Sequence, residues 1–425
     1  MTAKTRLTRR RTRTSLRSAL QCVSMAGMLT AAMAVRAQVL EQKPAREVLG
    51  MRLENLLALF QEKGNPAARD SAIEHLLRKA KRYGQPIVED STVLFFYYGK
   101  ARRVSAPGDL NGWHISEDTL TRVPGTDFFY LARKADPRSR FEYKLAVDSV
   151  WILDPANTRQ AMGGFGPNSE VWMPRYSPPE DISYREGIRH GSLDTLSIRS
   201  KTLGRTHPVF VYRPHGFARM QGHFPVIFVT DGGEYLSLGL MHNVLDNLIA
   251  EKRIRPIVAI FIDPRTDIRN SGTSQRMTEY AMSDTFVTFL INDVRARLMK
   301  KYRLTSNPGE TAVMGASLGG LIAAYASYRR PDVFGLCAAQ SPSFWVNRGA
   351  VIRLFREGEK KPVRFYIDTG TIRDSQAEAD EMRKVLLEKG YTLHYAEYPE
   401  GHNWANWRAR IADILTTFWA RPENN

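Results

Sequence analysis

Gly315-Ala316-Ser317-Leu318-Gly319 is the stretch that decides the fold, because it joins two apolar segments of different character. Residues 311–314 before it predict a short buried strand, and residues 320–327 after it predict a helix packed on small side chains. A glycine-flanked turn between strand and helix holds a serine hydroxyl at the helix N-terminus. The pattern therefore predicts Ser317 as the nucleophile of a serine hydrolase. The alternative is a helix cap with packing glycines.

A serine nucleophile needs a base, and the base needs an orienting acid. Two histidines follow Ser317 in the chain, His394 and His402. His394 alternates within a strand-like run, whereas His402 follows that run on a glycine-containing loop, so we predict His402 as the base. Asp368 ends a predicted strand and Asp374 lies on the loop beyond it. The loop residue is better placed to reach a histidine, and we favour Asp374 over Asp368 as the acid.

The negative charge that develops on the attacked carbonyl oxygen requires two backbone N–H donors. The residue after the nucleophile, Leu318, is expected to supply one of them. The second is expected from the Asp231-Gly232-Gly233 turn, where glycines let the backbone approach a substrate. We predict Gly233 as this donor, with Gly232 as the alternative.

The residue pattern differs among three stretches of the chain, which indicates several folded parts. Residues 38–88 carry apolar side chains at helical spacing and predict a helical segment. Residues 89–178 contain strand-like runs separated by turn residues, which predicts a small all-β sandwich. Residues 185–422 alternate short apolar runs with helical stretches. This alternation predicts an α/β domain with a mostly parallel sheet and helices on both faces.

Residues 1–37 resemble an export signal. They hold eight Lys and Arg residues and no acid, and an apolar stretch and small residues precede a plausible cleavage point at Gln38. We expect a periplasmic or secreted protein with no stable membrane insertion after cleavage; an uncleaved anchor is the alternative. The net charge of +17 owes much to this segment, and no nucleic-acid-binding motif accompanies it. The nine histidines form no metal-ligand spacing, so we expect neither a metal nor a cofactor.

Four loop segments occur in order at predicted strand ends: Val-Met-Gly-Ala-Ser-Leu-Gly-Gly-Leu at 313–321, Ala-Gln-Ser-Pro-Ser-Phe-Trp at 339–345, Gly-Thr-Ile-Arg-Asp at 370–374 and Gly-His-Asn-Trp-Ala-Asn-Trp-Arg at 401–408. With them, residues 190–420 resemble the enterochelin esterase (esterase D-type) family of α/β-hydrolases. The resemblance implies Ser317 as nucleophile and His402 as base. It also implies an acid at Asp374, where the siderophore esterases carry a glutamate.

The same resemblance suggests substrate contacts. Phe344 and Trp345 would line the acyl pocket, unless they are core aromatics. Arg373 would suit a negatively charged substrate.

Residues 90–175 resemble a second module, the glycogen-binding-type (CBM48-like) early-set domain with its immunoglobulin-like fold. Three segments carry the likeness, at 106–113, 141–148 and 150–155. The resemblance implies that Trp113 and Trp151 stack on sugar rings, with Lys144 and Asn168 as polar contacts. Aromatic rings pack on the CH groups of a sugar at little polar cost. In many enzymes, however, such a module only shapes the active-site cleft.

Together these features predict an exported serine carboxylesterase that forms an acyl-enzyme and acts on a small-molecule or oligosaccharide ester. The glycan-type module favours feruloyl or acetyl esters of carbohydrate, with a polysaccharide as possible partner. A catecholate siderophore (enterochelin-type) trilactone is the first alternative. A non-catalytic glycan-binding protein is the second, and acyl transfer in place of hydrolysis stays open.

Overall fold

The computed structural model describes residues 45–62, 64–84, 86–265 and 275–421. The predicted export signal at residues 1–37 lies outside the described residues and stays a prediction. All described elements belong to one compact unit, residues 42–425. Within the described ranges, no helix is both long enough and apolar enough to cross a membrane.

Helices open the described chain where the apolar spacing predicts them. Their inward side chains, such as Leu56 and Leu76, share one core with Phe96 and Phe128 of the sheet that follows. The helices therefore cover one face of that sheet. Their bounds are α2 (Ala45–Leu49), α3 (Leu53–Gln61) and α4 (Pro66–Tyr83).

Three small antiparallel sheets follow in residues 87–172. The first has the order β1-β2-β5-β4, the second β6-β10-β9 and the third β3-β7-β8. Phe95 of the first sheet meets Tyr143 of the second edge to face, with ring centroids 4.8 Å apart, inside a shared core. The strands are β1 (Ile87–Glu89), β2 (Thr92–Tyr98), β3 (Val104–Ser105), β4 (Thr121–Arg122), β5 (Phe128–Lys134), β6 (Arg140–Tyr143), β7 (Leu145–Val147), β8 (Val150–Ile152), β9 (Gln160–Gly163) and β10 (Gly166–Trp172). A short 3₁₀ turn, η1 (Asp109–Asn111), lies between β3 and β4. We call residues 87–172 the N-terminal module.

An eight-stranded sheet organises the rest of the chain, in the order β11-β12-β14-β13-β15-β16-β17-β18. Strand β12 pairs antiparallel with β11 and with β14, and every other neighbouring pair is parallel. The prediction of a mostly parallel sheet is confirmed, with an antiparallel edge. The strands are β11 (Ser192–Arg199), β12 (Thr206–Arg213), β13 (Val226–Val229), β14 (Val258–Ile262), β15 (Thr311–Ala316), β16 (Leu336–Gln340), β17 (Arg364–Gly370) and β18 (Thr392–Tyr398).

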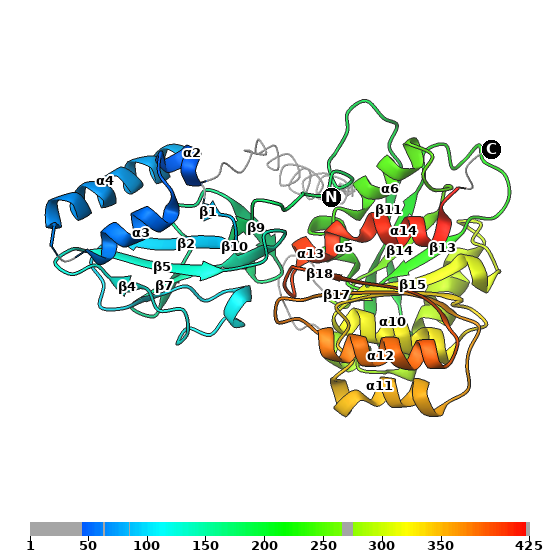
Figure 1. Ribbon diagram of the computed structural model, residues 1–425. Helices are drawn as coiled ribbons and strands as arrows, with labels where there is room; N and C mark the ends of the chain where they lie inside the picture. Colours follow the sequence, from blue (N-terminus) through cyan, green and yellow to red (C-terminus); the bar gives the residue numbers. More distant parts are fainter. Residues whose placement is uncertain (1–44, 63, 85, 266–274, 422–425) are drawn as a thin grey trace, which may run out of the picture. The chain divides into compact units, whose positions relative to one another are not determined.

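Helices cover both faces of this sheet, which is why its central strands are continuous apolar runs. Figure 1 shows α5, α6 and α14 on one face and α10, α11 and α12 on the other, and two separate apolar cores match these faces. The first face carries α5 (Gly232–Ser237), α6 (Met241–Ala250), α13 (Trp404–Ala409) and α14 (Ile411–Trp419). The second carries α7 (Arg276–Tyr280), α8 (Asp284–Thr288), the π-helical turn η2 (Phe289–Arg295), α9 (Ala296–Met299), α10 (Leu318–Arg329), α11 (Val346–Glu357) and α12 (Gln376–Glu388). A 3₁₀ turn, η3 (Pro308–Glu310), leads into β15.

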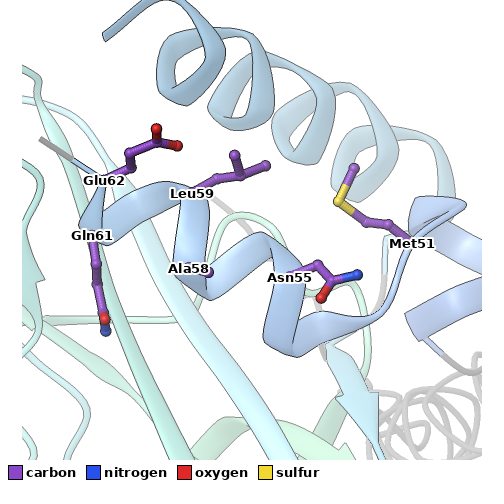
Figure 2. Close-up of a pocket in the computed structure, with 6 residues that line it drawn as sticks. All are labelled: Met51, Asn55, Ala58, Leu59, Gln61 and Glu62. Carbon is purple, nitrogen blue, oxygen red and sulfur yellow. The ribbon is translucent and has the colours of Figure 1, made fainter. Parts of the chain in front are cut away.

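A pocket of about 720 Å³ lies along α3 and is drawn in Figure 2. Its lining residues are Met51, Asn55, Ala58, Leu59, Gln61 and Glu62. None of them is a predicted site residue, and none is a serine, cysteine or histidine. The reacting groups therefore have to be sought elsewhere, at the carboxyl ends of the parallel strands.

Candidate active site

The predicted nucleophile stands at the sharp turn between β15 and α10. Ser317 has φ 59° and ψ −120°, a strained conformation for a side-chain-bearing residue that costs about 1–3 kcal/mol. The turn is held by the Ser317 N–H, which donates to the Gln340 carbonyl at 2.8 Å, and by the Ser317 carbonyl, which accepts from the Ser343 N–H at 3.0 Å. A Cβ at Gly315 would overlap Thr230 Oγ1, so the close approach of the two segments requires glycine. The hydroxyl is thereby presented at the start of α10.

The structure brings the three predicted catalytic side chains into one hydrogen-bonded chain. His402 lies on the loop between β18 and α13, with Nε2 3.0 Å from Ser317 Oγ. Its Nδ1 lies 2.6 Å from Asp374 Oδ1. The imidazole also packs edge to face on Trp407, with centroids 5.0 Å apart. One ring nitrogen can therefore receive the serine proton while the other is held by the acid.

Asp374 is buried and fully hydrogen-bonded. Its Oδ2 accepts from the Gly370 N–H at 2.6 Å and from Ser341 Oγ at 2.5 Å. Burial opposes ionisation of this carboxyl, but the hydrogen bonds from His402, Ser341 and Gly370 outweigh it and lower the pKa of Asp374. The acid is thus kept as a carboxylate that orients His402.

The competing acid, Asp368, serves a different partner. It lies within β17, two residues before the end of the strand, and is buried; its Oδ2 accepts from Gln340 Nε2 at 3.2 Å. Burial raises the pKa of Asp368 to about 7, and the nearby charge of Asp374 adds to the shift. The preference for Asp374 as the partner of His402 agrees with this geometry. His394, the other histidine, stacks on Tyr366 within the sheet.

The structure agrees with one of the two predicted oxyanion donors and not with the other. Leu318 begins α10 directly after the nucleophile, as the prediction requires. The prediction for Gly233 is wrong in this structure, because its N–H already donates to Asp263 Oδ2 at 2.9 Å. Arg265 holds the same carboxylate with Nη2 2.7 Å away. Gly232, the alternative donor, opens α5 beside it.

Arg276 links the Asp231-Gly232-Gly233 turn to the turn that carries Ser317. Its Nε donates to both oxygens of Asp231, at 2.9 and 3.0 Å, and its Nη2 donates to the Ala316 carbonyl at 3.0 Å. The guanidinium thus links the residue before the glycine turn to the residue before Ser317. It acts as an internal ion-pair group.

The three predicted substrate-binding residues differ in how far they are exposed to solvent. Phe344 is wholly buried in the core that lies against α10 and α11, so the prediction that it lines the acyl pocket is wrong. Trp345, one residue on, is 53% exposed and keeps its predicted role open. Arg373 donates from Nε to the Leu110 carbonyl at 3.1 Å and lies 3.8 Å from Glu117. Both of these contacts are with the N-terminal module.

The predicted carbohydrate-binding residues lie in the N-terminal module. Trp113 and Trp151 stack nearly parallel, with centroids 6.2 Å apart and an 11° interplanar angle, and Trp151 is 42% exposed. Lys144 follows β6 and is half-buried. Asn168 donates from Nδ2 to Glu142 Oε2 at 2.7 Å, so half of its amide already has a partner.

Sequence reasoning missed an exposed apolar hairpin beside the site. Met162 and Phe165, at the β9–β10 turn, are among the most exposed large apolar side chains of the described chain. A Cβ built on Gly164, between them, would lie 3.2 Å from Glu234 Oε1 and 3.9 Å from Trp404 Nε1. Glu234 directly follows the Asp231-Gly232-Gly233 turn, and Trp404 follows His402 by two residues. The signal was an aromatic residue flanked by glycines in Gly163-Gly164-Phe165-Gly166.

Among the described residues, no three His, Cys, Asp or Glu side chains cluster so that they could hold a metal ion. The single free cysteine among them, Cys337, is buried in β16. Burial raises the pKa of its thiol to about 12, so it is not a reactive thiolate.

Comparisons with known proteins indicate the family of this chain. A family model described as putative esterase matches residues 200–418. The iron(III) enterobactin esterase of Dickeya dadantii is 24% identical over 379 residues, covering 74% of this chain and 83% of that relative. The endo-1,4-beta-xylanase/feruloyl esterase of Xylanibacter ruminicola is 25% identical over 202 residues, covering 45% of this chain and only 27% of that relative.

Solved structures show the same fold. The enterobactin esterase of Shigella flexneri, crystallised in the presence of enterobactin, has a TM-score of 0.67 at 19% identity. The likeness covers 79% of this chain and 96% of that one. The prediction of an α/β-hydrolase fold for the eight-stranded part is therefore confirmed.

Proposed function

The chain belongs to the putative esterase family and is a carboxylic-ester hydrolase with an α/β-hydrolase fold, and we propose that it works as a serine esterase through Ser317. The observation that carries the proposal is the unbroken chain from Ser317 Oγ through both nitrogens of His402 to Asp374, with links of 3.0 and 2.6 Å. Both distances lie within the range that proton transfer needs.

In the proposed reaction, Ser317 Oγ attacks the ester carbonyl while His402 Nε2 takes its proton. Asp374 holds the Nδ1–H and stabilises the imidazolium that forms. The Leu318 N–H donates to the oxyanion, and His402 returns the proton to the departing alcohol. A water molecule, deprotonated by the same nitrogen, then releases the acid from the serine and restores the free hydroxyl.

For the substrate we propose acyl esters of carbohydrate, with feruloyl or acetyl groups as the acyl part. The stacked Trp113 and Trp151 support this choice, since the ring of Trp151 is exposed and an aromatic ring suits the apolar face of a sugar. They accord with a CBM48-like, immunoglobulin-like early-set role for the N-terminal module. On the acyl side, the exposed rings of Trp345 and Phe165 suit an aromatic group. We also propose that residues 1–37 direct export to the periplasm or beyond.

A catecholate siderophore trilactone is the second candidate substrate. It is favoured by the match to the iron(III) enterobactin esterase of Dickeya dadantii, which reaches across 74% of this chain and so includes more than the esterase domain. Arg373, whose side chain is 55% exposed beside the acid loop, would attract the negative charge of such a ligand.

Ester cleavage by the purified protein and by Ser317→Ala tests the proposal. Methyl ferulate, an acetylated xylan fragment and a catecholate trilactone form the panel. We expect turnover on at least one of them that disappears with the serine. Turnover that persists in Ser317→Ala would refute the proposed nucleophile, and the preferred ester decides between the two substrate classes.

A further inference from the structure

One short turn of the N-terminal module touches both loops that carry the catalytic acid and base. This turn is η1 (Asp109–Asn111), which lies 263 residues or more before the loops it meets. Its contacts are with residues that stand next to Asp374 and His402 in the chain, not with those side chains themselves. They can therefore set where the two loops lie without taking part in the reaction.

On the base side, both neighbours of His402 meet Asp109. Asn403 donates from Nδ2 to Asp109 Oδ2 at 2.9 Å. Gly401 packs so closely that a Cβ there would lie 2.6 Å from Asp109 Cγ. Asp109 itself is buried, and its oxygens are fixed within the module by the Trp113 Nε1–H at 3.0 Å and the Glu142 N–H at 2.8 Å.

A second buried group of the module holds the other end of the same amide. Arg140 is wholly buried, and its Nη1 donates to Asn403 Oδ1 at 2.9 Å. Its guanidinium is oriented by ion pairs with Glu142, 2.8 Å away, and with Glu170. The side chain of Asn403 is thus hydrogen-bonded at both its oxygen and its nitrogen, and both partners are held in place by further contacts within the module. The same oxygen caps α13 by accepting from the Asn406 N–H at 3.1 Å.

On the acid side, the contacts involve the two residues before Asp374. Arg373 donates from Nε to the Leu110 carbonyl at 3.1 Å. Ile372 packs against the apolar core of the N-terminal module. Its N–H donates to the Glu400 carbonyl at 3.1 Å, which joins the acid loop to the histidine loop.

We propose that the η1 turn and Arg140 are a brace that positions His402 and Asp374 for proton transfer, with Asn403 as the residue through which the brace acts on the histidine. The proposal rests on the serine esterase function. It gives the N-terminal module a role in turnover that is separate from any glycan binding. Asp109, Arg140 and Asn403 are positioning residues, since none of them touches the reacting atoms.

The effect of losing the brace follows from geometry. The His402 loop would keep its own backbone but lose the two contacts that fix Asn403 beside it. A displacement of about 1 Å in a catalytic group can cost on the order of a hundredfold in rate. Asp109, Arg140 and Asn403 are not among the residues proposed to bind the substrate. We therefore expect kcat to fall by about tenfold to a hundredfold, with KM changed by less than about threefold.

Asn403→Ser is the sharpest variant. Serine caps a helix as well as asparagine does, so α13 keeps its cap while the contacts with Asp109 and Arg140 are lost. Asn65→Ser is the matched control, because Asn65 caps α4 by accepting from the Ala68 N–H and lies far from the loops in the chain. Asp109→Asn is the second variant. Its control is Asp154→Asn, another buried carboxylate of the module, whose Oδ2 accepts from Tyr143 OH.

The readout is kcat per active serine, with active serines counted by fluorophosphonate titration. A loss confined to Asn403→Ser and Asp109→Asn supports the brace. Unchanged kcat per active serine in both variants overturns it, and so does an equal loss in the two controls, because both would mean that the module only stabilises the fold. The rate of fluorophosphonate labelling should fall in step with kcat.

A second readout separates this inference from the proposed function. The proton shared by His402 Nδ1 and Asp374 is observed by ¹H NMR in the same variants. If the wild-type protein were neither labelled nor active, the esterase mechanism would fail, but the signal would still report the brace. Its loss in Asn403→Ser and retention in Asn65→Ser supports the brace, and its retention in both refutes it.

Discussion

Replacing Asp374 by asparagine should disable the site with little loss of substrate binding. Asp374 Oδ1 accepts from His402 Nδ1 at 2.6 Å and from the Ser375 N–H at 2.7 Å, and Oδ2 accepts from the Gly370 N–H at 2.6 Å. An amide has one acceptor oxygen, so in either orientation its NH₂ group faces a backbone N–H. The imidazole loses its carboxylate, and we expect kcat to fall by about 10³–10⁴-fold. That loss corresponds to about 4–5.5 kcal/mol of transition-state stabilisation.

The assay is steady-state hydrolysis of an activated aryl ester, with denaturant unfolding measured in parallel. One mispaired buried donor should also lower the free energy of unfolding by about 1–3 kcal/mol. Asp368→Asn is the matched control: the same substitution six residues earlier, at a carboxylate that contacts Gln340 and not His402. It should leave kcat within about threefold of the wild type. Retention of more than a tenth of the activity in Asp374→Asn, or an equal loss in Asp368→Asn, would refute this assignment.

Three further predictions follow from the same contacts. Gly315→Ala should lower the free energy of unfolding by about 3 kcal/mol or more, because a Cβ would overlap Thr230 Oγ1; an unchanged denaturation midpoint would contradict the close packing of the nucleophile turn. Burial raises the pKa of Asp368 to about 7 in the folded protein, so between about pH 4 and 7 the folded state keeps a proton that the unfolded state releases, and stability falls as pH rises through this window. Asp368→Asn should flatten that slope in melting temperatures measured at pH 5 and pH 8, and equal slopes would count against the shift. Phe165→Ala should raise KM several-fold for feruloyl esters but not for acetyl esters, measured side by side, and a change common to both would exclude a contact with the aromatic acyl group.

Much of the site could be predicted because its residues follow strand ends. Ser317, Asp374 and His402 each stand on a loop after a parallel strand, and parallel strands bring such loops to one edge of a sheet. The choice of Asp374 over Asp368 needed only their place relative to the end of β17. Local sequence was sufficient for these assignments because the fold itself gathers the loops.

The misses arose where a partner lies far away in the chain. Gly233 donates to Asp263, thirty residues on, because β13 and β14 are neighbours in the sheet. Phe344 and Trp345 are adjacent and both aromatic, yet one is wholly buried and the other is 53% exposed. The contact between Asp109 and Asn403 joins residues 294 apart. No pattern of spacing or composition reports such contacts.

Trapping of the acyl-enzyme tests the central claim most directly. The protein is mixed with a p-nitrophenyl ester, quenched in acid within milliseconds, digested and examined by mass spectrometry. The account predicts one acyl group on the peptide that contains Ser317, and none in Ser317→Ala, whose turnover is abolished. An acyl group on another residue, or turnover by Ser317→Ala, would contradict it.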